Sequence, residues 1–128
     1  MTKKVLVVDD EEDVRGLLAA ILKEHCYEVV MAANPLEAFD RLQEERPDMI
    51  VLDIMMPYME GHTFIEELEA RDLWPQIPVL VLTASHIDYN FAQRKLGAQH
   101  CMLKPLEVDE FVQRIHVLIG KAQTRGKK

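Results

Sequence analysis

Five short apolar runs alternate with five longer amphipathic segments along the chain. The runs are rich in β-branched residues and have the length of strands; they cover residues 4–8, 28–32, 49–52, 79–82 and 101–103. Between them, apolar residues spaced i, i+3, i+4 and i+7 predict helices, most regularly over 14–22 and 108–119. The pattern therefore predicts five strands, each followed by a helix.

The other three helices are predicted from their ends as well as from their apolar spacing. Asn34 is expected to be an N-cap, with Pro35 at the first helical position and Glu37 at the capping-box position. A second helix is expected to follow Gly61, and a third is expected to end at Gly97.

The strands are apolar on both faces, which is typical of a parallel sheet covered by helices on each side. The predicted fold class is therefore α/β, doubly wound. In such sheets, ligands bind beyond the carboxyl ends of the strands. Residues that follow the strands are the first candidates for function.

Polar residues stand at the carboxyl end of four of these runs. Asp9 and Asp10 follow the first, Asp53 the third, Thr83 the fourth and Lys104 the fifth. Three neighbouring carboxylates repel one another unless a cation neutralises them. Oxygen ligands favour Mg²⁺, with Mn²⁺ as a similar ion, and such a cation commonly joins carboxylates to a phosphoryl group. The sequence thus predicts a metal-dependent phosphoryl site.

Each of these residues also has a plainer explanation. The acidic run 9–13 suits the positive end of a helix, Thr83 suits a local backbone hydrogen bond, and Lys104 suits an exposed surface. Only their joint placement favours a site. A dinucleotide or flavin site is disfavoured because the first turn is acidic rather than glycine-rich. A phosphatase of the haloacid dehalogenase type is disfavoured because Met55, not an aspartate, lies two residues beyond Asp53.

The composition indicates the class of protein and its compartment. The chain has 128 residues, 48% hydrophobic and 29% charged, with a formal charge of −7, which suits one globular domain and disfavours nucleic-acid binding by it. Cys26 and Cys101 lack metal-ligand spacing and are expected to be buried, inert thiols. Without a signal peptide or an apolar run of membrane length, we expect a cytoplasmic protein. One domain is expected over residues 1–120, followed by a basic tail or the start of a linker over 121–128.

Four motifs, in order, resemble the receiver domain of two-component response regulators over residues 3–120. They are VVDDE at 7–11, DIMMPYMEG at 53–61, LTA at 82–84, and GA at 97–98 leading to KP at 104–105. The resemblance implies a flavodoxin-like sheet of five parallel strands in the order 2-1-3-4-5, with five helices. It also implies a cis peptide bond between Lys104 and Pro105.

The resemblance implies a role for each carboxylate. Asp53 would accept a phosphoryl group from a phosphohistidine of a sensor histidine kinase or phosphotransfer protein. Asp10, Asp53 and the backbone carbonyl of Met55 would bind Mg²⁺, while Asp9 would act through a bound water.

Thr83 and Lys104 would each contact a phosphoryl oxygen. The implied function is a phosphorylation-controlled signalling switch with at most self-dephosphorylation, not an enzyme that turns over a free substrate. The surface of the fourth helix, fifth strand and fifth helix would control an output partner or domain, and the resemblance allows a homodimer through this surface. No membrane contact is expected. A small Mg²⁺-dependent aspartate phosphatase and a non-phosphorylated docking scaffold remain open alternatives.

The chain departs from the family pattern at the switch. Cys101 stands three residues before Lys104, where many members carry a Tyr or Phe that changes rotamer on activation. The segment 83–97 is also about one residue shorter than usual. Moving an equilibrium from 1:99 to 99:1 takes about 5.5 kcal/mol, and a charge-assisted hydrogen bond from Thr83 supplies roughly 1.5 to 3 kcal/mol. We therefore predict that phosphorylation causes a smaller population shift in this chain, or that it acts through a different residue such as His100 or Phe91.

Overall fold

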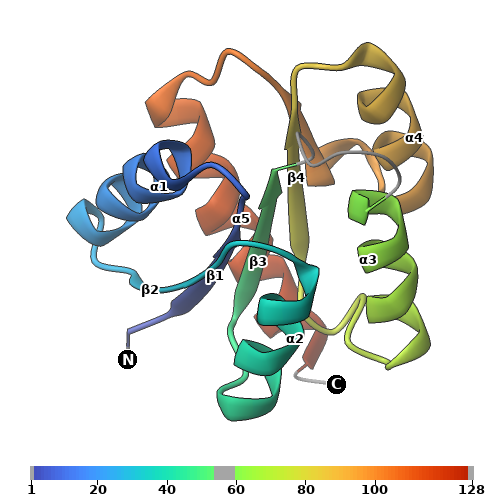
Figure 1. The fold of residues 1–128 in the computed structure, drawn as a ribbon. Helices are drawn as coiled ribbons and strands as arrows, with labels where there is room; N and C mark the ends of the chain where they lie inside the picture. Colours follow the sequence, from blue (N-terminus) through green and yellow to red (C-terminus); the bar gives the residue numbers. More distant parts are fainter. Residues whose placement is uncertain (1, 54–59, 127–128) are drawn as a thin grey trace.

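The computed structural model describes residues 2–53 and 60–126, and these form a three-layer α/β fold (Figure 1). The elements follow one another as β1 (Lys4–Val8), α1 (Glu12–Glu24), β2 (Glu28–Ala32), α2 (Pro35–Glu44), β3 (Met49–Asp53), α3 (Glu60–Ala70), β4 (Val79–Thr83), α4 (His86–Leu96), the 3₁₀ turn η1 (Ala98–His100), β5 (Cys101–Leu103) and α5 (Val108–Gly126). The strands pair in parallel in the order β2-β1-β3-β4-β5. Both the fold class and the strand order are therefore confirmed.

The helices cover the two faces of the sheet unequally. α1 and α5 lie on one face, and α2, α3 and α4 lie on the other (Figure 1). Every residue of the central strands β3 and β4 is buried. Because strand side chains alternate between faces, two separate cores form. Phe64 and Ile50 belong to the core beneath α2 to α4, whereas Phe111 and Val51 belong to the core beneath α1 and α5.

Local signals set most of the helix ends. The Asn34 side chain accepts a hydrogen bond from the Glu37 backbone N–H at 2.9 Å, and the Glu37 carboxylate accepts one from the Ala33 N–H at 2.8 Å. These bonds confirm the predicted start of α2. Gly97 follows the last residue of α4 with φ +107°, a backbone conformation that favours glycine.

Two helix boundaries differ from the sequence prediction. α3 begins at Glu60, so Gly61 lies inside the helix rather than before it. α5 continues through Gly120 to Gly126, and residues 121–126 extend this helix. A Cβ at Gly120 would meet nothing within 4 Å, so packing does not require a glycine at this position. It costs an exposed helix only about 1 kcal/mol and therefore does not end it. A linker function for the end of the chain stays a prediction.

Cys26 is exposed, so the expectation that both thiols are buried is wrong for this residue. It follows the end of α1 with φ 70°, in the left-handed conformation that often closes a helix. Cys101 is buried, as expected. Burial raises the pKa of the Cys101 thiol, which favours the protonated, unreactive form.

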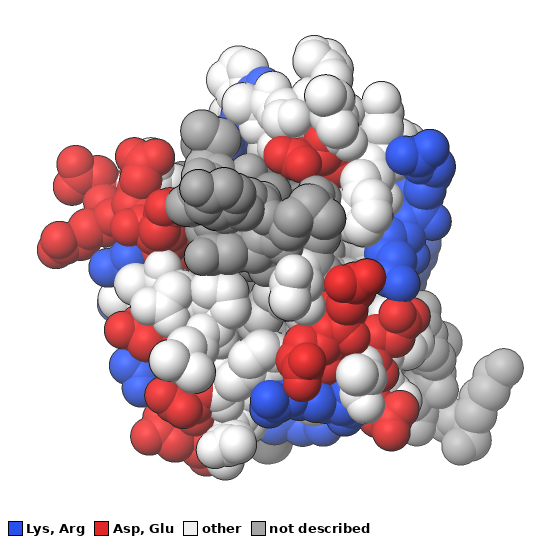
Figure 2. Space-filling model, turned by 45° about the vertical axis from the view of Figure 1, so that its right-hand side comes forward, with Lys and Arg blue, Asp and Glu red and all other residues white. Residues whose placement is uncertain are grey.

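The charge of the chain is distributed in patches. On the face shown in Figure 2, acidic side chains form several separate groups, with Lys and Arg side chains beside them. Within residues 2–53 and 60–126, no helix is both long enough and apolar enough to cross a membrane.

Candidate functional site

The β1–α1 turn holds Asp9 in a fixed position at the carboxyl edge of the sheet. Asp9 is fully buried. Its backbone N–H donates to the Ala32 carbonyl at 3.1 Å, and its Oδ1 accepts a hydrogen bond from the Glu11 N–H at 2.9 Å. The Arg15 guanidinium donates to the Asp9 carbonyl at 2.8 Å. The other carboxylate oxygen of Asp9, Oδ2, is buried and lacks a hydrogen-bond partner among the described residues.

Asp53 reaches the same edge from the end of β3 and is 1% exposed. Its Oδ2 accepts a hydrogen bond from the Lys104 ammonium, which is the ion pair that joins β3 to the segment after β5. Its Oδ1 is buried and, like Asp9 Oδ2, has no hydrogen-bond partner in the described part of the chain. The Lys104 ammonium therefore pairs with Asp53, and each of the two buried carboxylates keeps one unsatisfied oxygen.

Thr83 completes this edge from the end of β4, the neighbour of β3, and is fully buried. Its hydroxyl oxygen accepts a hydrogen bond from the Ser85 N–H at 3.0 Å. Its carbonyl accepts one from the Lys104 N–H at 2.8 Å. The Thr83 hydroxyl proton stays available for donation, because the bond to Ser85 uses only a lone pair. The peptide bond between Lys104 and Pro105 is cis, as the family resemblance implied.

The electrostatics of this edge disfavour two ionised carboxylates. Burial, together with the neighbouring Asp53 carboxyl, raises the pKa of Asp9 to about 7. The Glu11 N–H and the Lys104 charge oppose this rise without cancelling it. A single ammonium group thus leaves negative charge uncompensated, and either a proton or a further cation has to supply the balance.

The structure gathers four of the predicted site residues. Asp9, Asp53, Thr83 and Lys104 meet at one edge of the sheet. Asp10 is exposed, and within the described ranges no three acidic, His or Cys side chains form a ready metal cluster. Met55, whose carbonyl the resemblance implies as a ligand, lies outside the described residues. The metal ligand set therefore stays a prediction.

The predicted switch positions Thr83 and Cys101 are both buried. Thr83 is at the reacting edge, whereas Cys101 begins β5 and its thiol faces the carbonyls of Gly97 and Ala98, each at 3.8 Å. His100 precedes it, with its Nδ1 2.8 Å from the Val79 carbonyl. The stretch from Cys101 to Lys104 thus runs from the start of β5 to the candidate site.

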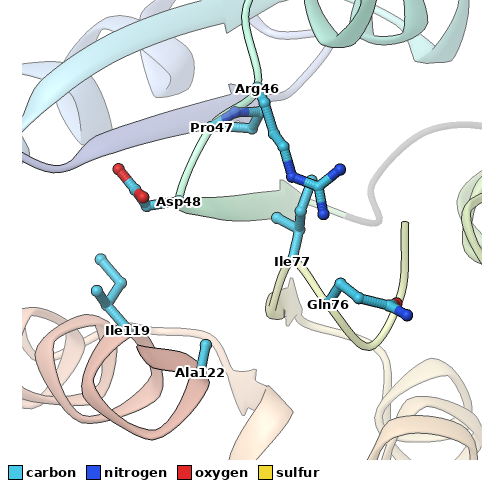
Figure 3. Close-up of a pocket in the computed structure, with 7 residues that line it drawn as sticks. All are labelled: Arg46, Pro47, Asp48, Gln76, Ile77, Ile119 and Ala122. Atoms are coloured by element: carbon cyan, nitrogen blue, oxygen red, sulfur yellow. The ribbon is translucent and has the colours of Figure 1, made fainter. Parts of the chain in front are cut away.

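A concave groove of about 220 Å³ lies at the opposite edge, where the strands begin (Figure 3). It is lined by Arg46, Pro47, Asp48, Gln76, Ile77, Ile119 and Ala122. The Asp48 carboxylate in this groove already accepts a hydrogen bond from the Lys4 N–H at 2.8 Å. The groove contains none of the predicted site residues.

Sequence reasoning missed two features of the structure. Arg15 was not predicted to touch the site, and an arginine in the first turns of an acidic helix start was its only sequence signal. Trp74 packs edge-on against His100, with ring centroids 4.9 Å apart, and the Trp74–Pro75 bond is also cis. No sequence signal indicated this aromatic pair.

Comparison with known proteins identifies the family. The model of the response regulator receiver domain matches residues 5–116. The chain belongs to the response regulator receiver domain family. It is 34% identical over 111 residues to the sporulation initiation phosphotransferase F of Bacillus subtilis, and the match covers 86% of this chain and 88% of that protein.

The receiver domain also resembles longer regulators. It is 35% identical over 124 residues to the alkaline phosphatase synthesis transcriptional regulatory protein PhoP of Bacillus subtilis, covering 96% of this chain and 51% of that protein. The chain thus spans about half the length of PhoP. Among solved structures, the chemotaxis response regulator CheY4 of Vibrio cholerae is 28% identical with a TM-score of 0.79, covering 92% of this chain and 99% of that one. Phosphorylation and Mg²⁺ are typical of this family.

Proposed function

We propose that this receiver domain is a phosphorylation-controlled switch, in which Asp53 accepts a phosphoryl group from a phosphohistidine of a sensor kinase or phosphotransfer protein. One observation carries the proposal. Asp9 and Asp53 are buried beside each other at the carboxyl edge of the sheet, and each keeps an oxygen without a hydrogen-bond partner among the described residues. Such oxygens are costly unless they bind something.

A divalent cation fits these two oxygens. Both are hard carboxylate ligands, which Mg²⁺ prefers, and its charge would offset the repulsion that raises the pKa of Asp9. Asp53 would hold the ion directly and Asp9 would hold it through a bound water, and Asp10 and the Met55 carbonyl are the further ligands that the family resemblance implies. When bound, the ion supplies positive charge that stabilises the phosphoryl oxygens during transfer.

Asp53 is the nucleophile in this proposal. One of its oxygens attacks the phosphorus atom of the donor, and a new O–P bond forms as the N–P bond to the donor imidazole breaks. The electron pair of the broken bond leaves with the imidazole, which takes a proton from solvent. Asp53 needs no general base because the ionised carboxylate carries no proton.

Lys104 and Thr83 stabilise the transferred group. The Lys104 ammonium already reaches Asp53 and can follow the new negative charge onto a phosphoryl oxygen. The Thr83 hydroxyl can donate its proton to a second phosphoryl oxygen while its own oxygen keeps the Ser85 contact. Positioning and opposed charge are the main requirements of phosphoryl transfer.

In this proposal the response to phosphorylation passes through β5. Cys101 buries less apolar area than an aromatic ring, so its displacement would contribute less to a change of state. The His100 ring contacts the Val79 carbonyl and Trp74. His100 and Phe91 stay the two alternative routes. We therefore expect a partial shift at the surface of α4, β5 and α5, where an output domain or partner would bind.

Intact-mass measurement after incubation with acetyl phosphate and Mg²⁺ tests the proposal. We expect one base-labile phosphoryl group on the wild-type chain and none on Asp53→Asn. Asp48→Asn is the matched control, because it removes an aspartate at the other end of the same strand. It should be phosphorylated like the wild type.

The other outcomes separate the alternative functions. Sustained hydrolysis of phosphomonoesters would favour an aspartate phosphatase over a switch that at most dephosphorylates itself. Absence of any adduct on a folded wild-type chain would favour a docking scaffold and contradict the proposal.

A further inference from the structure

Arg15 lies beside the acidic site, although its position in the helix is electrostatically unfavourable. It is the fourth residue of α1, where the positive end of the helix dipole repels cations. It is half-buried, and its guanidinium donates to the Asp9 carbonyl at 2.8 Å. No ion pair of Arg15 with a carboxylate is present within residues 2–53 and 60–126. Among the hydrogen bonds of the described residues, the bond to the Asp9 carbonyl is the one that the Arg15 side chain makes.

That bond is one of three that fix the Asp9 residue. Ala32 holds its N–H, Glu11 holds its Oδ1, and Arg15 holds its carbonyl. Together they leave Oδ2 as the one oxygen of Asp9 that can meet a ligand. The Arg15 bond closes the turn from the helix side, because it reaches back over six residues.

We propose that Arg15 is a positioning residue for the cation site, acting through the Asp9 carbonyl to keep Oδ2 of Asp9 directed towards Asp53. The inference rests on the proposed function, since it assumes that the two carboxylates bind a divalent cation. Residues that orient a metal ligand commonly change metal affinity 10- to 100-fold when they are removed.

The direction of the change in Kd for Mg²⁺ distinguishes a positioning role of Arg15 from an effect of its charge. Arg15 is itself a cation near the site, so its charge alone opposes binding of Mg²⁺. Loss of that charge would tighten Mg²⁺ binding, whereas loss of the hydrogen bond would loosen the turn and weaken it. The two explanations therefore predict opposite changes in Kd.

Titration of Mg²⁺, followed by the backbone amide resonances of residues 9–11 and 53, tests this inference. We expect Arg15→Gln to raise the Kd roughly tenfold, and Arg15→Lys to raise it less because lysine keeps the charge and one reachable donor. Arg41→Gln is the matched control: Arg41 also donates to a backbone carbonyl, that of Met31 at 3.2 Å, but it lies on α2. Its Kd should equal that of the wild type.

An unchanged or lower Kd in Arg15→Gln would overturn the inference, and so would an equal rise in Arg41→Gln. A wild-type chain without any Mg²⁺-dependent shift would contradict the proposed function instead. In that case hydrogen exchange of the Glu11 amide in the metal-free protein still decides the role of Arg15. Faster exchange in Arg15→Gln supports it as the residue that holds the turn, and unchanged exchange overturns it.

Discussion

The two edges of the central sheet satisfy their polar groups to different degrees. Where the strands begin, the Asp48 carboxylate accepts a hydrogen bond from the Lys4 N–H, and the His100 ring contacts the Val79 carbonyl. The Lys4 ammonium also pairs with Glu45 at 2.7 Å. These groups are held by ordinary structural contacts.

Where the strands end, the same kinds of groups are left incomplete. Asp9 and Asp53 are more deeply buried than Asp48, which is exposed, yet each has an oxygen without a partner in the described residues. The groove in Figure 3 is at the satisfied edge, and the chemistry is at the other. The unsatisfied buried oxygens, rather than this groove, therefore mark the candidate site.

The largest difference between the edges should come from their lysines. We expect Lys104→Met to reduce the rate of phosphorylation by acetyl phosphate at least about 100-fold, because it removes the cation that meets the phosphoryl oxygens. Lys4→Met, at the satisfied edge, should leave the rate unchanged. Intact-mass time courses measure both rates, and a similar loss in the two variants would remove the distinction between the edges.

Asp9→Asn should stabilise the metal-free protein. The folded-state pKa of Asp9 is raised to about 7, so its stabilising contribution is present at acidic pH and lost as the pH rises through 7. At pH 8 the full cost of ionising Asp9 beside Asp53 is therefore present. We expect the variant to gain about 2 kcal/mol in free energy of unfolding at pH 8, measured by denaturant titration with a chelator.

The control for this gain is Asp48→Asn, which should change the free energy of unfolding by less than about 0.5 kcal/mol. Asparagine at position 48 can still accept the hydrogen bond from the Lys4 N–H. Loss of stability in Asp9→Asn would contradict the proposed repulsion between Asp9 and Asp53.

Mg²⁺ binding should weaken as the pH falls. The cation and a proton compete for the same carboxylates, and Asp9 takes up a proton below a pKa of about 7. The apparent Kd for Mg²⁺ should therefore rise about tenfold from pH 8 to pH 6. Calorimetric titration at the two pH values measures this change, and an equal Kd at both would show that no proton is displaced.

The smallest effect is expected at Cys101. A beryllofluoride mimic of the phosphoryl group should move the amide resonances of α4, β5 and α5 only part of the way towards a second state. Cys101→Ala should change this displacement little, because both side chains are small. A complete displacement that is the same in Cys101→Ala would rule out Cys101 as the limiting residue.

The edges also differ in how far sequence predicts them. The ends of the strands follow from apolar runs that stop at Asp9, Asp53, Thr83 and Lys104. Parallel strands bring their carboxyl ends to one edge, so these residues could be placed together without coordinates. The start of α2 was equally readable, because Asn34 makes its capping contact within four residues.

Contacts that depend on the path of individual side chains could not be predicted from the sequence. The bond from Arg15 to the Asp9 carbonyl depends on the path of one long side chain, which periodicity does not define. The pairing of Trp74 with His100 joins residues from two loops before neighbouring strands. The sequence pattern predicts the last helix over 108–119, whereas α5 continues past Gly120, because exposed glycine only weakens a helix whose apolar face is packed.

Amide resonances recorded during a Mg²⁺ titration test the central contrast most directly. The account predicts saturable shifts for residues 9, 10, 11 and 53, with no comparable change for residues 4, 48, 79 and 100 at the other edge. Replacing either Asp9 or Asp53 with asparagine should greatly weaken the response. Resonances of residues 9 and 53 that stay unmoved at saturating Mg²⁺, or shifts spread equally over both edges, would contradict it.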